Sequence, residues 1–217
     1  ARRFLASGSR HGVRQATAGA GKVASAMLRD PASSPTVVHH ALHCHPAGPC
    51  TAVRAITGSA SLTDSGMLAL SYRLYGDPEH IRTPEPAPPV AADELWRHTC
   101  FEAFIAAVDG LEYREFNFSP SGQWAGYRFT GYRARDLSFV PHTAPRFTFL
   151  PLPDGFQLDA LLAPAMLPPG AALEIGLSAV IEAGDGSKSY WALTHCAAQP
   201  DFHLRQSFAL TLNRAMP

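Results

Sequence analysis

The residues best suited to bind a small ligand lie in two neighbouring segments, where polar side chains recur at every second position. Trp96, His98 and Glu102 have the same parity, so on a β-strand they would share one face. Glu115 and Asn117 alternate with two phenylalanines in the next segment. An indole beside a carboxylate, an amide and an imidazole is a set that suits small polar ligands, sugars in particular. No nucleophile with a base, phosphate loop or zinc-type spacing accompanies this set, so the sequence predicts binding rather than catalysis.

Trp96 and Trp191 are the candidate stacking platforms. Sugars present flat, weakly apolar C–H faces, on which aromatic rings stack while polar neighbours hydrogen-bond the hydroxyl groups. The alternative for both residues is a position in the core, where large indoles are commonly buried. The full set of predicted ligand-binding residues is Trp96, His98, Glu102, Glu115, Asn117, Trp124, Arg128, Trp191 and His195.

Glu102 is flanked by apolar residues, and a carboxylate is costly to bury there without a partner. We expect it to reach a ligand, a metal or an arginine, and Arg97 and Arg128 are the available arginines. A structural Glu–Arg pair is as good an interpretation as ligand contact. For Glu115 and Asn117 the alternative is exposure to solvent. A sequence does not fix the distance between two carboxylates, so glycoside hydrolysis is not predicted.

The histidines are given a structural role by default. This holds for His98, His195 and His203, although His195 has the same parity as Trp191. The segment 43–50 contains two histidines and two cysteines, but the second ligand pair of a zinc site is missing. No metal site is therefore predicted.

Three blocks of sequence resemble the family 9 carbohydrate-binding modules and the wider DOMON-like group. The blocks are L-W-x-H-T-C-F-E-x-F (95–104), E-F-N-F-S-P-S-G-x-W-x-x-Y-R-F (115–129), and Y-W-A-L-T-H (190–195) with P-D-F-H (200–203). The nearest resemblance is to a bacterial branch of stand-alone DOMON-like proteins, and it covers roughly residues 42–212.

The resemblance implies an immunoglobulin-like β-sandwich that binds a sugar or haem. In the carbohydrate-binding modules two tryptophans enclose the terminal sugar. Trp96 matches the first of them by its spacing to Glu102, and Trp191 lies in the corresponding late strand. The asparagine usually found near the second tryptophan is not evident here, which weakens the match of Trp191.

The same resemblance implies an alternative ligand, b-type haem, because related cytochrome domains hold the iron between a methionine and a histidine. Met67 and His195 are the residues that would do so here. A methionine in an apolar strand is more often part of the core. The favoured expectation is a small sugar-like ligand with no cofactor.

The elements that position these residues read as short strands separated by glycine, proline and aspartate turns. Leu68, Leu70, Tyr72 and Leu74 are expected to face inward from one of them. The candidate strands are 51–62, 67–75, 94–108, 112–118, 123–133, 147–150, 156–162, 173–182, 188–196 and 207–213, with a helical turn at 164–167. The pattern predicts an all-β, immunoglobulin-like antiparallel β-sandwich, with a closed barrel as the alternative.

Composition limits the partners. The 217 residues carry a net charge of zero with a pI near 7.3, which argues against nucleic acid or an anionic membrane as a partner. No apolar run approaches the roughly 20 residues needed to span a bilayer. The oligomeric state is not predicted.

Residues 1–41 are expected to form a flexible basic leader, with six basic residues and one acidic residue. They lack the apolar stretch of a secretory signal. A leader that is not native, with Met27 as the true start, is one interpretation of this segment, and the folded domain is predicted to span 42–217. Without an export signal the four cysteines are interpreted as reduced thiols and the protein as cytoplasmic.

Overall fold

The computed structural model describes residues 37–214, and most of the predicted leader lies outside this range. The described chain forms twelve strands and four single-turn 3₁₀ helices. The strands are β1 (His40–Cys44), β2 (Val53–Leu62), β3 (Leu68–Gly76), β4 (Ile81–Arg82), β5 (Cys100–Ala107), β6 (Tyr113–Phe118), β7 (Trp124–Phe129), β8 (Arg146–Leu152), β9 (Gly155–Leu162), β10 (Ala172–Ala183), β11 (Lys188–Ala192) and β12 (Leu210–Asn213). The helices are η1 (Pro78–His80), η2 (Leu95–Arg97), η3 (Pro164–Met166) and η4 (Arg205–Ser207).

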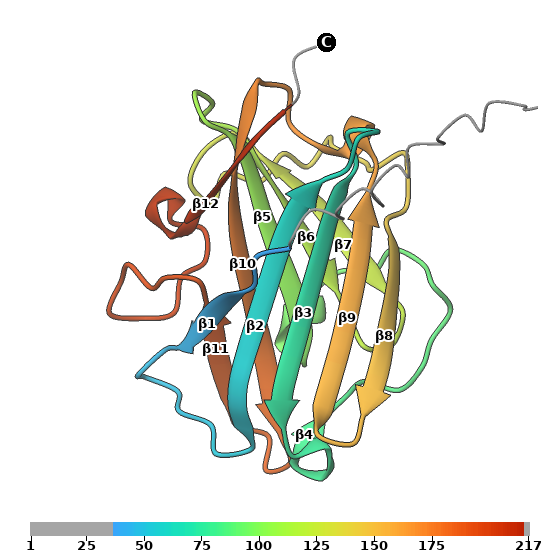
Figure 1. Cartoon of the computed structure of the whole chain (residues 1–217), viewed down its shortest axis with the longest axis vertical. Coiled ribbons are helices and arrows are strands. Elements are labelled where there is room, and N and C mark those ends of the chain that lie inside the picture. The colour runs from blue at the N-terminus through green and yellow to red at the C-terminus, as the bar shows by residue number, and fades with distance from the viewer. Residues whose placement is uncertain (1–36, 215–217) are drawn as a thin grey trace, which may run out of the picture. The chain divides into compact units, whose positions relative to one another are not determined.

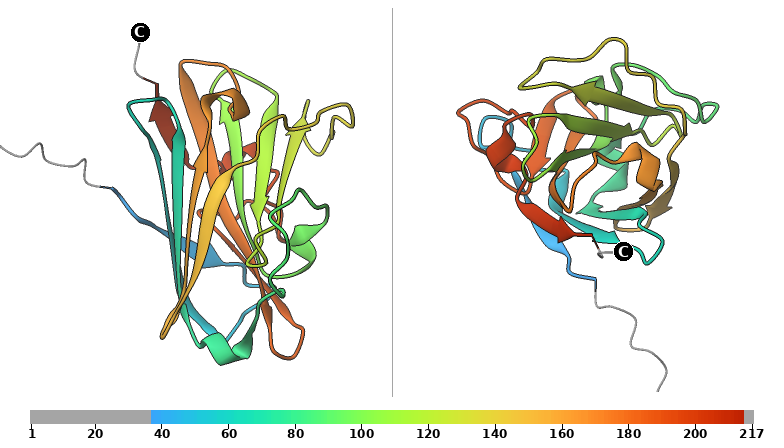
Figure 2. Two further views of the ribbon diagram at one scale, coloured as in Figure 1. Left: turned by 90° about the vertical axis from the view of Figure 1, so that its right-hand side faces the viewer. Right: turned by 90° about the horizontal axis from the view of Figure 1, so that it is seen from above.

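Every strand pair is antiparallel, so the prediction of an all-β antiparallel fold is confirmed. The hydrogen-bonded order is β7-β6-β5-β10-β11-β1-β2-β3-β9-β8, and β4 and β12 both pair with β10. The strands β2, β3, β9 and β8 form a front layer, which faces a back layer of β11, β10, β5, β6 and β7 (Figures 1 and 2). Strand β1 connects the layers, because it pairs with β2 on one side and with β11 on the other.

The main core lies between the two layers and follows the alternation of the strands. Its largest fully buried side chains include Tyr72 and Leu74 from the front layer and Phe101, Phe116 and Phe118 from the back layer. The four residues predicted to face inward from β3 are all buried. Burial of a single side chain of this size stabilises a fold by about 1.5–3 kcal/mol.

The outer face of the back layer is also buried. A second cluster of apolar side chains lies there, made of Phe104, Ala106, Tyr113, Ala125, Tyr127, Phe129 and Phe208, with Leu95 and Phe202 packed against it. Strands β5 and β6 are therefore covered on both faces. This second layer of packing explains why β5 is almost uninterruptedly buried.

Several element boundaries differ from the sequence predictions. The strand expected at 94–108 begins only at Cys100, because Glu94 has a left-handed backbone (φ 61°) and residues 95–97 form η2. Strands β1 and β4 were not predicted, and β1 begins two residues before the predicted start of the folded domain. No helix within residues 37–214 is long and apolar enough to cross a membrane.

Candidate functional site

A cleft of about 410 Å³ opens on the outer face of the back layer. It combines aromatic side chains with charged ones. The lining residues are Glu94, Trp96, Glu102, Phe104, Glu115, Tyr127, Phe129, Arg133, Arg135, Val180, Tyr190, Pro200, Phe202 and His203. They come from five strands, from η2 and the residue immediately before it, and from the two loops that follow β7 and β11.

The floor of the cleft is built by strand register. Ser178 of β10 lies opposite Glu102 of β5, which in turn lies opposite Asn117 of β6. Directly opposed residues of antiparallel strands point to the same face, with Cβ atoms about 4.5–5.5 Å apart. The register therefore places a hydroxyl, a carboxyl and an amide in one row. The next row contains Phe104 and Glu115.

This polar row is buried but incompletely hydrogen-bonded. Ser178, Glu102 and Asn117 are 2%, 3% and 0% exposed. Among the residues that the structure describes, Ser178 Oγ, Glu102 Oε1 and Asn117 Oδ1 have no hydrogen-bond partner. A buried polar group without a partner costs about 1–3 kcal/mol, and native proteins contain few of them. Glu102 is the member of this row that lines the cleft, so its free oxygen can receive a polar group of a ligand, whereas Ser178 and Asn117 are buried beside it and do not line the cleft.

Both floor glutamates are shifted toward their neutral forms. Burial raises the pKa of Glu102 well above its usual range, and the negative charge of Glu115 raises it further. Burial also raises the pKa of Glu115 to about 7, although the hydrogen bond from Asn117 and the charges of Arg135 and Arg133 act in the opposite direction. Near neutral pH this pair therefore both donates and accepts hydrogen bonds.

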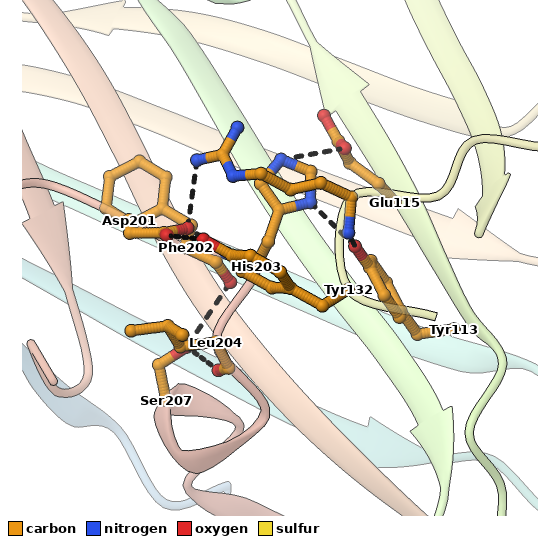
Figure 3. A network of polar contacts seen from close by, with 9 residues as sticks. Tyr113, Glu115, Tyr132, Asp201, Phe202, His203, Leu204 and Ser207 are labelled. Atoms are coloured by element: carbon orange, nitrogen blue, oxygen red, sulfur yellow. Dashed lines mark hydrogen bonds and ion pairs between the residues drawn. The ribbon is translucent and has the colours of Figure 1, made fainter. Parts of the chain in front are cut away.

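Glu115 belongs to a polar chain that reaches Tyr113 through His203 (Figure 3). Asn117 Nδ2 donates to Glu115 Oε1 at 2.8 Å. The Arg133 N–H donates to Tyr113 Oη at 3.1 Å, and this hydroxyl is hydrogen-bonded to His203 Nδ1 at 2.8 Å. The other ring nitrogen, Nε2, lies 3.8 Å from Glu115 Oε2. Burial lowers the pKa of His203 to about 4, so the ring is neutral.

Asp201 links the loop after β7 to the loop after β11 through hydrogen bonds, and both loops line the cleft. Its carboxylate accepts from Tyr132 Oη at 2.6 Å and from Arg133 at 2.9 Å, both in the loop after β7. It also accepts from the backbone N–H of His203 at 3.0 Å. Ser207 Oγ holds the same segment from below by donating to the carbonyl groups of Phe202 and Leu204 (Figure 3). Residues far apart in sequence thus form one wall.

Trp96 also lines the cleft, and its side chain on η2 is 47% exposed. The helix is short but tied to the sheet, because the preceding Asp93 accepts a hydrogen bond from Tyr127 at 2.9 Å. Tyr190 of β11 also lines the cleft. The indole is therefore accessible from solvent beside a row of unpaired polar atoms, which is the arrangement expected of a stacking platform.

The structure brings four of the predicted site residues together. Trp96, Glu102 and Glu115 line the cleft, and Asn117 is fully buried opposite Glu102 in the strand register. Exposure of Glu115 and Asn117 to solvent, the alternative interpretation, is wrong, since they are 5% and 0% exposed. The predicted burial of Glu102 is confirmed, but within residues 37–214 no arginine forms an ion pair with it.

The arginines considered for Glu102 have other partners. Arg97 donates to Glu94 at 2.8 Å. Arg128 pairs with Asp136. The structural Glu–Arg pair proposed from the sequence is therefore wrong.

Three predicted ligand residues face away from the cleft because of strand parity. Trp191 pairs with Ala179 on the inner face and belongs to the main core, where its Nε1 donates to Ser189 at 2.9 Å. Trp124 lies opposite Phe118, so it and Arg128 point to the other face of β7 from Tyr127. The backbone of Trp124 forms two hydrogen bonds with the segment before η2, one with Val90 and one with Ala92. Trp191, Trp124 and Arg128 therefore lie outside the lining of this cleft.

The two predicted histidines are also outside the cleft lining. His98 Nδ1 lies 2.7 Å from Glu182, on the far side of η2. His195 Nε2 donates to the carbonyl oxygen of His43 at 2.8 Å. His195 approaches the cleft only through Phe202, whose ring centroid is 6.3 Å away. Both residues have the structural role that was their default interpretation.

Met67 and His195, the alternative haem ligands, lie at opposite ends of β2. Met67 is bonded to Thr63 beyond one end of the strand. His195 is hydrogen-bonded to His43, and Leu42, the residue before His43, pairs with Ile56 of β2. Eight residues of strand correspond to about 26 Å at ~3.3 Å per residue. The two side chains are too far apart to bind one iron atom.

Sequence reasoning missed much of the aromatic wall. Tyr190, Phe202 and His203 fall inside the sequence blocks that resemble carbohydrate-binding modules, so those blocks did contain the signal. Tyr127 and Phe129 could have been found from the alternation of β7. Arg133 and Arg135 follow that strand in a loop without periodicity, and no sequence pattern indicated them.

Comparison with known proteins gives a fold and no family. Neither a protein-family model nor a curated protein matches the sequence. A crystal structure of a candidate carbohydrate-binding protein from Bacteroides uniformis is similar, with a TM-score of 0.58 and 12% identity over 82% of this chain and 86% of that chain. A family 9 carbohydrate-binding module from Caldicellulosiruptor kristjanssonii, in complex with cellotriose, has a TM-score of 0.50 and 12% identity over 82% of each chain. At this identity the likeness establishes that the chain has the all-β fold of these proteins.

Proposed function

We propose that this chain is a non-catalytic module that binds a small carbohydrate in the cleft beside Trp96. The observation that carries the proposal is the position of a half-exposed indole next to a buried polar row with three unpaired atoms. Aromatic rings supply the apolar contact that a pyranose face needs. The carboxyl groups of Glu102 and Glu115, which line the cleft, supply the directional hydrogen bonds.

The likeness in fold supports the proposal, because a module with this fold was solved with cellotriose. The sequence blocks at 95–104 and 115–129 support it independently, since they contain Trp96, Glu102, Glu115 and Asn117. We propose on the same blocks that the finer class is an immunoglobulin-like sandwich of DOMON-like type. The physical argument for sugar binding does not depend on that classification.

The test is a titration of the purified protein with glucose, cellobiose, xylose and galactose, followed by tryptophan fluorescence. The chain has three tryptophans, of which Trp124 and Trp191 are buried. Ligand-dependent quenching or a blue shift therefore reports on Trp96. Trp96→Ala is expected to weaken binding at least tenfold, because truncation of a stacking residue typically costs over about 1.4 kcal/mol.

Trp124→Phe is the matched control, because this indole lies on the opposite face of β7 and its loss should leave affinity within twofold. Binding that survives Trp96→Ala, or a complete panel of sugars with no response, would contradict the proposal. Release of shorter sugars from cellobiose would contradict its non-catalytic part.

A further inference from the structure

The unpaired atoms of the floor specify what the ligand must donate. Asn117 Oδ1 is an acceptor only, and one of its two amide N–H groups donates to Glu115. Glu102 Oε1 is an acceptor whenever the carboxyl is ionised, and the Ser178 hydroxyl can also accept. A sugar hydroxyl has one hydrogen to donate. A primary ammonium group has three, on one small centre.

The charges around the cleft lead to the same requirement. Three guanidinium groups lie in or beside it, and each one is paired with a carboxylate at the rim. The pairs are Arg97–Glu94 at 2.8 Å, Arg133–Asp201 at 2.9 Å and Arg135–Asp93 at 3.3 Å. Among residues 37–214, Glu102 and Glu115 have no arginine or lysine partner, and the closest basic group to Glu115 is the neutral ring of His203.

The walls are compatible with a positive charge. Six aromatic rings line the cleft, from Trp96, Phe104, Tyr127, Phe129, Tyr190 and Phe202. The face of an aromatic ring attracts a cation, and the attraction grows when the cation is desolvated. Bringing a cation into the floor would also compensate the cost of ionising two buried carboxyl groups.

We propose that the ligand is an amino sugar, whose protonated amine lies against Glu102 and Glu115 in the cleft while its ring stacks on Trp96. This proposal rests on the proposed function and names its ligand class. The amine donates to the free oxygen of Glu102 and favours the ionised forms of the two carboxyl groups, which burial otherwise shifts toward neutral. A neutral sugar can donate a hydrogen bond to the floor, but it carries no charge that would favour the ionised carboxyl groups.

The experiment is isothermal titration calorimetry of the whole protein at pH 6 with glucosamine, glucose and N-acetylglucosamine. Glucosamine is expected to bind at least tenfold more tightly than glucose. N-acetylglucosamine is expected to bind no better than glucose, because acetylation removes the charge and two of the donors. Equal or tighter binding of glucose overturns this inference and leaves the sugar-binding function standing. No binding of any of the three overturns the inference, and the wider sugar panel then decides the proposed function separately.

Glu102→Gln identifies the residue responsible, because it keeps the shape and removes the charge. The ratio of glucosamine to glucose affinity should fall to within about twofold. The matched control is Glu112→Gln, in the turn between β5 and β6 and outside the cleft lining, which should keep the wild-type ratio. If Glu102→Gln does not fold, as judged by thermal unfolding, Glu115→Gln tests the same charge. A ratio unchanged in the folded variant refutes the assignment.

Discussion

The two faces of the back layer are equally buried and chemically different. On the inner face, β5 and β6 contribute Phe101 and Phe118, both 0% exposed and packed in the main core. On the outer face the same strands contribute Glu102 and Asn117, which are as well buried but have unpaired polar atoms.

Two neighbours on β11 show the same division. Trp191 packs in the main core, whereas the adjacent Tyr190 lines the cleft. Burial alone therefore does not distinguish core from site in this protein. The difference lies in whether the buried polar groups are satisfied, because a fold optimised for stability alone would not retain unsatisfied groups.

The largest expected difference between the core and the cleft is the stability cost of truncating a tryptophan in each. Trp191→Ala should lower the free energy of unfolding by about 3–5 kcal/mol, because it removes a core indole and leaves a cavity. Trp96→Ala should cost less than about 1 kcal/mol, since its side chain is already half exposed. Urea unfolding measures both. Similar costs for the two variants would mean that Trp96 is a structural residue.

A smaller effect concerns the pH dependence of stability. The folded state raises the pKa of Glu115 from 4.5 to about 7, so Glu115 makes stability fall as pH rises through that window. It lowers the pKa of His203 from 6.5 to about 4, so His203 makes stability rise with pH in that range. The two contributions oppose each other between about pH 4.5 and 6.5.

Substituting Glu115 or His203 should reveal the pH dependence of stability that the other residue contributes. Relative to wild type, Glu115→Gln should gain stability between pH 5 and pH 6.5, and His203→Gln should lose it, each by up to about 2 kcal/mol. Urea unfolding at the two pH values measures the change. Parallel pH profiles for both variants would show that these groups are not perturbed by the fold.

The smallest expected effect is a gain of stability. Glu102→Leu replaces a buried, unpaired carboxyl group with an apolar side chain, and it should raise the free energy of unfolding by about 1 kcal/mol. Phe101→Leu, on the inner face of the same strand, should lower it by about 1 kcal/mol. Comparing the two substitutions tests whether the side chains on the cleft face stabilise the folded protein. Destabilisation by Glu102→Leu would indicate a structural role for the carboxyl.

The sequence by itself determined the fold class and the faces of the central strands. Alternation with a period of two is a local property, so the pattern around Glu102, Glu115 and Asn117 placed them opposite the phenylalanines of the core, as the structure confirms. The same alternation predicted the buried face of β3. These assignments need no knowledge of distant residues.

Only the tertiary structure decided which face of β7 and β11 meets the cleft. Alternation separates Trp191 from Tyr190, but register with β10 decides which of them lies over the site. Trp96 does line the cleft, although it reaches it from a 3₁₀ turn and not from a strand. The burial of Glu115 depends on His203 and on the loop after β7, held together by Asp201. Such contacts join segments that are roughly 70–90 residues apart, and long-range packing of this kind leaves no local period in the sequence.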